Sequence, residues 1–321
     1  MKEALIEIRN LKTFLYTEKG ILKAVNGVNL FLRRGEITGL AGESGCGKSM
    51  TAYSILRLVP NPPGKIVGGE IIFEGKNLLK ISESDMRKIR GNEIAMIFQD
   101  PLTSLNPVFT VGNQLVEAIK LHQDIGRRET LKKAIEMLGL VNISRPEIRI
   151  KQYPHQFSAG MRQRIMIAMA LACNPSLLIA DEPTSALDVT IQAQILYLIT
   201  ELVSKLNNSV LLITHDLGVI AEVCDFVYIM YAGKIVEYAS AKEIFFGSKH
   251  PYTQKLMESM PTLNEQKDEL RVIKGSVPSL INPPSGCSFH PRCPKVKTIC
   301  CEEEPAFIEI NSDHFVACFL S

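Results

Sequence analysis

The sequence predicts an α/β fold built around one parallel sheet, and three observations lead to this prediction. The pattern G-x-x-x-x-G-K-S at residues 42–49 lies between a strand-like segment, 36–40, and an apolar helical segment, 50–58. A second apolar run, 177–180, leads directly into two carboxylates. Residues 108–157 show the spacing of amphipathic helices and few strand signals.

Length and charge exclude several classes of protein. A chain of 321 residues suits one large domain or two modest ones. Its formal net charge of +2, from 36 basic and 34 acidic residues, does not indicate a nucleic-acid partner. No apolar run approaches the roughly 18 residues of a membrane span, and the start does not resemble a signal peptide. We therefore expect a soluble, cytosolic protein.

The loop at residues 42–49 has the strand–loop–helix setting of a phosphate-binding P-loop. Glycines permit the tight turn that points successive backbone N–H groups at a phosphate chain, at the positive end of a helix dipole. Lys48 would reach the β- and γ-phosphates, and Ser49 would offer its hydroxyl to Mg²⁺. The predicted nucleotide contacts are Gly42, Ser44, Gly45, Cys46, Gly47, Lys48, Ser49 and Met50.

Upstream of the loop, residues 6–9 and 25–30 alternate apolar and polar side chains, which predicts an antiparallel hairpin. Tyr16 or Phe14 could stack on adenine, although packing on the sheet explains such an aromatic equally well. We choose Tyr16. We also expect Cys46, at a helix N-terminus beside a lysine, to have a lowered thiol pKa and to react with maleimides unless ATP shields it.

Three further segments place polar side chains where a nucleotide site needs them. The apolar run 94–98 ends at Gln99, which could hold a water molecule or complete a Mg²⁺ shell. The run 177–180 ends at Asp181, a candidate Mg²⁺ ligand, and Glu182, a candidate general base. A later strand is followed by His215, which could contact the γ-phosphate and the attacking water. Each, taken alone, could equally be a satisfied residue at a strand edge.

The helical segment closes on Ser158, which is placed as the N-cap of the helix that runs to Cys173. Small residues beside it leave the helix N-terminus open to an anion. Read alone, this is only a capped helix.

Together these residues resemble the ATPase subunits of ABC transporters, over residues 1 to about 245. The resemblance rests on Lys48-Ser49, Gln99, Ser158-Ala159-Gly160, Asp181-Glu182, Ser185-Ala186-Leu187-Asp188 and His215, in the family's order and spacing. It implies an ABC-ATPase fold with a RecA-like core, an antiparallel β subdomain and a helical subdomain. It also implies that Ser158 and Gly160 act on ATP held by the P-loop of a partner subunit, and that Asp188 is a further nucleotide-binding residue.

The chain further resembles the dipeptide/oligopeptide and nickel importer branch of this family. The segments that carry this resemblance are GESG at 42–45, FQDP at 98–101, SLNP at 104–107, MRQR at 161–164, HPYT at 250–253, GSVP at 275–278 and PSGCSFHPRCP at 284–294. It implies import of di- or oligopeptides at the cytoplasmic face of the membrane. The implied partners are a second, similar ATPase, two transmembrane permease subunits and, indirectly, an extracellular peptide-binding protein, with no nucleic acid.

Five of the eight cysteines crowd the last 35 residues. Cys287, Cys293, Cys300 and Cys318 supply four thiolates, which suit a 4Fe–4S cluster or Zn²⁺. Spacing without a C-x-x-C pair fits a zinc ribbon poorly, and the resemblance implies iron–sulfur, so we predict a 4Fe–4S cluster, with zinc or unligated thiols as the alternatives. Cys300 is preferred to its neighbour Cys301 on the family's spacing.

The predicted organisation is a nucleotide-binding domain over residues 1–250, with a helical subdomain at about 101–174, and a small Cys-rich domain over 251–321. Two other functions remain open at this point. One is a nickel or other small-solute importer ATPase of the same branch. The other is a soluble ABC ATPase that acts on nucleic acid or ribosomes, although such proteins usually carry two nucleotide domains or a long coiled-coil insertion.

Overall fold

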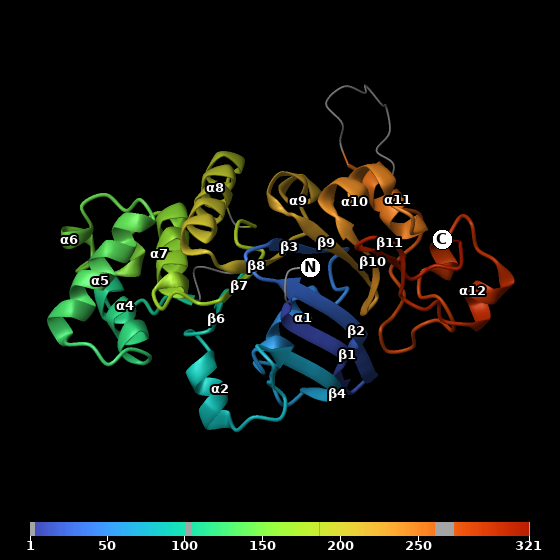
Figure 1. The fold of residues 1–321 in the computed structure, drawn as a ribbon, viewed down its shortest axis with the longest axis horizontal. Coiled ribbons are helices and arrows are strands. Elements are labelled where there is room, and N and C mark those ends of the chain that lie inside the picture. The colour runs from blue at the N-terminus through green and yellow to red at the C-terminus, as the bar shows by residue number, and fades with distance from the viewer. Residues whose placement is uncertain (1–3, 100–103, 186, 261–272, 321) are drawn as a thin grey trace. The chain divides into compact units, whose positions relative to one another are not determined.

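The computed structural model describes residues 4–99, 104–185, 187–260 and 273–320 (Figure 1). These residues fall into two compact units. The first draws on Met1–Arg33, Ile37–Lys80 and Ile213–Ser321, and the second on Arg34–Glu36 and Ile81–Leu212. The domain boundaries predicted from the sequence stay a prediction.

The first unit begins with an antiparallel sheet in the order β2-β1-β4-β5. Its strands are β1 (Ala4–Thr17), β2 (Gly20–Arg33), β4 (Gly64–Phe73) and β5 (Lys76–Asn77). Ile6 and Ile8 are buried and, after a register shift, so are Leu11 and Thr13, which is the pattern of a strand with one face on a core. The hairpin predicted near the N-terminus is therefore confirmed by β1 and β2, which pair from Ala4–Arg33 to Thr17–Gly20.

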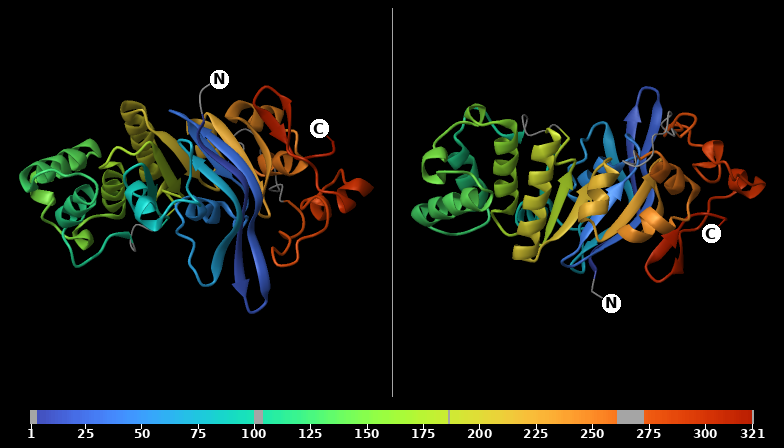
Figure 2. Two further views of the ribbon diagram at one scale, coloured as in Figure 1. Left: turned by 60° about the horizontal axis from the view of Figure 1, so that its bottom comes forward. Right: turned by 90° about the horizontal axis from the view of Figure 1, so that it is seen from above.

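The same unit contains the strands that frame the P-loop. β3 (Ile37–Ala41) runs parallel to β9 (Phe226–Tyr231), β9 pairs antiparallel with β10 (Lys234–Ser240), and β12 (His314–Val316) joins β10 to β11 (Ile308–Asn311). The helices are α1 (Lys48–Ile55), α9 (Leu217–Val223), α10 (Ala241–Gly247), α11 (Pro251–Glu258) and α12 (Thr298–Glu302), with the 3-10 turn η2 (His290–Arg292). In both views of Figure 2 the red C-terminal segment lies beside the orange helices α10 and α11.

The second unit contains parallel strands and most of the helices of the predicted insertion. Strand β6 (Ile94–Ile97) pairs in parallel with β7 (Leu177–Asp181), and β8 (Ser209–Ile213) follows β7 in the sheet order. Every residue of β7 is buried, so its apolar run is that of a central parallel strand. Its helices are α2 (Glu83–Ile89), α4 (Val111–Lys120), α5 (Arg127–Leu140), α6 (Pro146–Arg149), α7 (Ala159–Leu171) and α8 (Val189–Leu206), with the 3-10 turn η1 (Pro154–Gln156).

The helical spacing noticed in the sequence is confirmed by α4, α5 and α7, which pack against one another (the green helices of Figure 1). On α4, Val111, Leu115 and Ile119 are all fully buried, one turn apart. Thr110 caps this helix by accepting a hydrogen bond from the Asn113 N–H at 3.2 Å. Within the described ranges, no helix is both long enough and apolar enough to cross a membrane.

Candidate functional site

The P-loop joins β3 to α1 and depends on glycine at two positions. A Cβ at Gly42 would lie 2.1 Å from the Met230 carbonyl oxygen, and one at Gly47 would lie 2.2 Å from the Ala24 carbonyl oxygen. Both residues also have positive φ, 152° at Gly42 and 110° at Gly47. The loop backbone therefore lies close against neighbouring strands. Gly47 is the N-cap of α1. Because glycine has no side chain, it does not cap the N–H groups of the first turn.

Lys48 lies folded back over this loop. Its Nζ donates to the Gly42 carbonyl at 2.8 Å and to the Glu43 carbonyl at 3.1 Å, and the residue is only 5% exposed. Ser49 follows in the first turn of α1 and is half-buried, while Ser44 and Gly45 are exposed at the tip of the loop. A lysine ammonium beside exposed loop amides is the donor set that a phosphate chain requires. Met50, on α1, is half-buried.

Two expectations for neighbouring side chains have different outcomes. Tyr16, on β1, is 50% exposed, as a ring free to stack must be, whereas Phe14 is half-buried. The role of Tyr16 in adenine binding stays a prediction. For Cys46 the expected reactivity is wrong, because the side chain is fully buried and burial raises the pKa of its thiol. The Lys48 ammonium acts in the opposite direction but does not overcome the loss of solvation.

His215 belongs to the same unit as the P-loop and is exposed. It comes just after β8 and just before α9, whose N-cap is Asp216. The Asp216 carboxylate accepts from the N–H groups of Gly218 at 2.9 Å and Val219 at 3.3 Å. His215 is therefore held on a capped turn at the end of a strand.

In the second unit, the structure brings together Gln99 and Glu182. Ile97 of β6 pairs with Ala180 of β7, so both side chains lie two residues beyond the same rung of a parallel ladder. Gln99 Nε2 donates to Glu182 Oε2 at 3.0 Å. Ligand sites of parallel sheets lie at this carboxyl edge.

The two carboxylates that end β7 have different surroundings. Asp181 is fully buried, and Glu182 is half-buried with φ of 46°, which is uncommon for a residue with a side chain. The backbone N–H and hydroxyl of Ser185 donate to the Glu182 carbonyl at 3.3 Å and 3.2 Å and hold that turn. Carboxylate, amide and hydroxyl oxygens are ligands that suit Mg²⁺, so Asp181 and Gln99 in this unit, and Ser49 in the first unit, each offer a donor of the right chemistry.

Ser158, Gly160 and Asp188 lie at or next to helix N-termini in the second unit. Ser158 is the N-cap of α7 as predicted, and its Oγ accepts from the Met161 N–H at 3.3 Å. Asp188 is the N-cap of α8 and accepts from the Ile191 N–H at 3.0 Å. A Cβ at Gly160 would lie 2.8 Å from Ile191 Cγ2, so glycine allows α7 to approach α8. Their roles toward a partner's nucleotide stay predictions.

The thiols of the C-terminal region gather but do not form a metal site. Cys287, Cys293, Cys300 and Cys318 line one cavity of about 10 Å³, together with aromatic and proline side chains. That volume is barely enough for one water molecule. Burial raises the pKa of the Cys287 thiol to about 11 and also raises the pKa of Cys293 and Cys318.

The predicted 4Fe–4S cluster is therefore wrong. Among the residues that the structure describes, no group of three or more His, Cys, Asp or Glu side chains could hold a metal ion, which also removes the zinc alternative. The four cysteines named from the sequence do lie around one cavity, and Cys300 rather than Cys301 lines it. The sequence could not show how small that cavity is.

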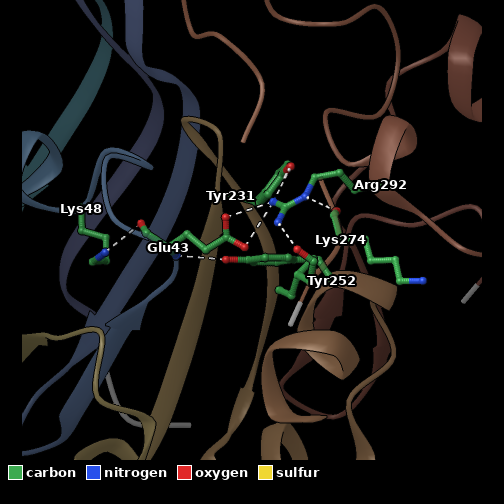
Figure 3. Close-up of polar contacts among 7 residues, drawn as sticks. Glu43, Lys48, Tyr231, Tyr252, Lys274 and Arg292 are labelled. Carbon is green, nitrogen blue, oxygen red and sulfur yellow. Dashed lines mark hydrogen bonds and ion pairs between the residues drawn. The ribbon is translucent and has the colours of Figure 1, made fainter. Parts of the chain in front are cut away.

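Sequence reasoning missed a contact made by the P-loop itself. The Glu43 carboxylate pairs with Arg292 of η2, 3.0 Å from Nη1 to Oε2, and the Glu43 N–H donates to Tyr252 Oη at 3.0 Å (Figure 3). Both GESG and HPRCP stood out as segments of the sequence, but no spacing rule relates residues 249 positions apart.

Comparisons with known proteins agree with this geometry. Residues 25–185 match the family described as ABC transporter, and residues 236–300 match the family described as oligopeptide/dipeptide transporter, C-terminal region. The probable peptide ABC transporter ATP-binding protein y4tR of Sinorhizobium fredii is 55% identical, covering 99% of this chain and 96% of its own. The oligopeptide transport ATP-binding protein AppD of Bacillus subtilis is 50% identical, covering 98% of this chain and 96% of its own.

Solved structures show the same fold. A dimeric ATP-binding cassette in a post-hydrolysis state, bound to ADP and phosphate, superposes with a TM-score of 0.66 at 26% identity, covering 74% of this chain and 98% of its own. A subunit of the cbiONQ ABC transporter complex of Clostridium perfringens gives a TM-score of 0.65 at 25% identity, covering 77% of this chain and 92% of its own. The predicted ABC-ATPase fold is confirmed. The chain belongs to the ABC transporter family of ATP-binding proteins, and it carries the C-terminal region of the oligopeptide/dipeptide transporters.

Proposed function

We propose that this chain is the ATP-binding and ATP-hydrolysing subunit of an importer for di- or oligopeptides. The hydrogen bond from Gln99 to Glu182 at the carboxyl edge of β6 and β7 carries the hydrolytic part of this proposal. The relatives are named as peptide, oligopeptide and dipeptide transport proteins, which supports the substrate class. The matched C-terminal region supports it independently.

The residues divide the chemistry of hydrolysis between them. Lys48 and the P-loop N–H groups bind the phosphates of ATP and stabilise the negative charge on the transferred phosphoryl group. Glu182 accepts a proton from the attacking water, and Gln99 orients that carboxylate through its amide. His215 contacts the γ-phosphate and the water. Ser49, Gln99 and Asp181 are the residues that would hold Mg²⁺, and the ion would neutralise phosphate charge.

The remaining predicted contacts complete the nucleotide site. Tyr16 stacks on adenine. Ser158 and Gly160 at the N-terminus of α7, with Asp188 at the N-terminus of α8, act on ATP that a partner subunit binds. One chain therefore cannot complete the reaction by itself, and closure of two subunits around ATP couples nucleotide binding to transport.

The partners follow from this arrangement. We infer that a second, similar ATPase subunit pairs with this chain as a heterodimer, and that two transmembrane permease subunits bind the pair at the cytoplasmic face of the membrane. An extracellular peptide-binding protein would deliver the substrate to the permeases, so it acts on this chain only indirectly.

Peptide uptake into vesicles tests the proposal. Vesicles that contain both permeases, the partner ATPase and this chain should accumulate a labelled oligopeptide only when Mg²⁺-ATP is supplied on the side that carries the ATPases. The variant Glu182→Gln should abolish this uptake, while Glu136→Gln, on an exposed face of α5, should leave it unchanged. Uptake of labelled nickel, with no uptake of peptide, would contradict the peptide assignment.

A further inference from the structure

One P-loop residue, Glu43, uses every polar group that it has. Its carbonyl accepts from Lys48 Nζ at 3.1 Å, and its backbone N–H donates to Tyr252 Oη at 3.0 Å. Its carboxylate accepts two hydrogen bonds from Arg292 Nη1, at 3.0 Å to Oε2 and 3.2 Å to Oε1. Figure 3 shows these contacts meeting at Glu43. The residue that holds the phosphate-binding lysine is therefore itself held by two residues from far along the chain.

Arg292 is anchored on all three of its nitrogen atoms, and its side chain is only 6% exposed. Nε donates to the Lys274 carbonyl at 3.1 Å, Nη2 to the Ile273 carbonyl at 3.2 Å, and Nη1 also to Tyr231 Oη at 3.2 Å. A planar guanidinium can make this set of contacts at once, whereas a lysine ammonium cannot. The position of Arg292 is thus fixed by the C-terminal region rather than by Glu43 alone.

Tyr252 is equally fixed. The residue lies in α11 and is fully buried, with its ring 4.5 Å from that of Tyr231 and 5.4 Å from that of Phe289. Phe289 in turn packs edge-on against Tyr231 at 5.2 Å. Three aromatic rings therefore join α11 and the segment before η2 to the end of β9, and they leave the Tyr252 hydroxyl directed at the P-loop.

We propose that the C-terminal region, here α11 together with residues 273–320, positions the P-loop of its own chain for ATP through Glu43, with Arg292 and Tyr252 as the positioning residues. If Glu43 were released, the loop and Lys48 would gain other conformations, and ordering them would weaken ATP binding. This inference rests on the proposed function, because it concerns the affinity of the same site for ATP.

A second ion pair provides a matched control. Arg33, at the end of β2, pairs with Asp313 in the turn between β11 and β12, and its side chain is 11% exposed. This pair also ties the C-terminal region to the rest of its unit, but the partners that the structure gives to Asp313, which are Arg33 and Glu309, lie outside the P-loop. Breaking either pair should loosen the C-terminal region in general, whereas only breaking the Glu43–Arg292 pair should weaken ATP binding.

The experiment measures the Kd for Mg²⁺-ATP of the intact chain and of the variants Glu43→Gln, Arg292→Met and the double variant. We expect each single variant to weaken ATP binding about tenfold, and the double variant to bind no more weakly than either single one. Tyr252→Phe, which removes only the hydroxyl, should weaken binding in the same direction. Asp313→Asn should leave the Kd unchanged.

Several outcomes would overturn the inference. They are an unchanged Kd in Glu43→Gln, additive effects in the double variant, or an equal loss in Asp313→Asn. Should Arg292→Met fail to fold, Glu43→Gln alone decides, because it keeps the shape of a partly exposed loop residue. A wild-type chain that bound no ATP would overturn the proposed function, and this inference with it. If the wild-type chain binds ATP and the variants bind it equally well, this inference is overturned but the proposed function is not.

Discussion

Gln99 and Glu182 meet at the carboxyl ends of two neighbouring parallel strands, where Gln99 Nε2 donates to Glu182 Oε2 across 3.0 Å. The amide holds one carboxylate oxygen of Glu182 in place at this edge of the sheet. A carboxylate oriented in this way is suited to act as a general base.

The variant Gln99→Glu should change the pH dependence of ATP hydrolysis. A second carboxylate within hydrogen-bonding distance of Glu182 would disfavour ionisation of both groups at once, because two like charges at that distance repel each other. The acidic limb of the pH–rate profile should therefore move to higher pH. Gln99→Ala should lower kcat about tenfold without this shift. A profile for Gln99→Glu that coincides with that of Gln99→Ala would contradict the contact.

The variant Lys48→Ala should lower the affinity for ATP by about 100-fold, because the loop loses the ammonium that lies over the carbonyls of Gly42 and Glu43. Equilibrium binding of Mg²⁺-ATP to the intact chain would measure this. The matched substitution Lys65→Ala, at an exposed position of β4, should leave the affinity unchanged. Equal affinity of Lys48→Ala and wild type would remove Lys48 from the binding site.

Cys46 should resist maleimide in the folded chain, whether or not ATP is present. The side chain is fully buried, and burial raises the pKa of the thiol, so both access and thiolate are lacking. Peptide mapping by mass spectrometry, before and after denaturation, would measure the modification. Rapid modification of the folded chain at neutral pH would show that the loop opens far more readily than this packing allows.

His250 should make the fold less stable in acid. It is the N-cap of α11, its Nδ1 accepts from the Tyr252 N–H at 3.1 Å, and burial lowers its pKa to about 3. The unfolded chain binds a proton at this site near pH 6.5 but the folded chain does not, so stability falls as the pH drops from about 6.5 toward 3. The loss at pH 5 should be about 2 kcal/mol relative to neutral pH.

The variant His250→Asn isolates this effect, because asparagine also caps a helix but does not titrate. Urea unfolding from pH 7.5 to pH 5 should show a shallower loss of stability in the variant than in wild type, by about 2 kcal/mol at pH 5. Parallel pH dependences in the two proteins would mean that His250 binds a proton as readily in the folded chain as in the unfolded chain.

Local patterns predicted the elements of the nucleotide site well. The run 177–180 became the fully buried strand β7, Ser158 became the N-cap of α7, and the glycines of the P-loop proved necessary for space as well as for conformation. The strand and the helix cap depend on neighbours within a few residues, which a sequence displays directly, whereas the space at Gly42 is set by Met230, far along the chain.

Long-range packing explains what could not be predicted. A helix N-terminus and a nearby lysine favour a low pKa for Cys46, but the burial that reverses this comes from the surrounding strands. The four C-terminal cysteines have the spacing of a metal site, but the cavity between them is about 10 Å³. The Glu43–Arg292 pair likewise joins two segments whose approach depends on the whole fold of the unit.

The most direct test of the account is to measure ATP binding and ATP hydrolysis together in the variant Glu182→Gln, assembled with its partner ATPase and permeases. We predict that hydrolysis falls at least about 100-fold while Mg²⁺-ATP still binds, because the general base is lost and the phosphate cradle remains. Hydrolysis at the wild-type rate in this variant would contradict Glu182 as the base, and with it the hydrolytic site proposed at the ends of β6 and β7.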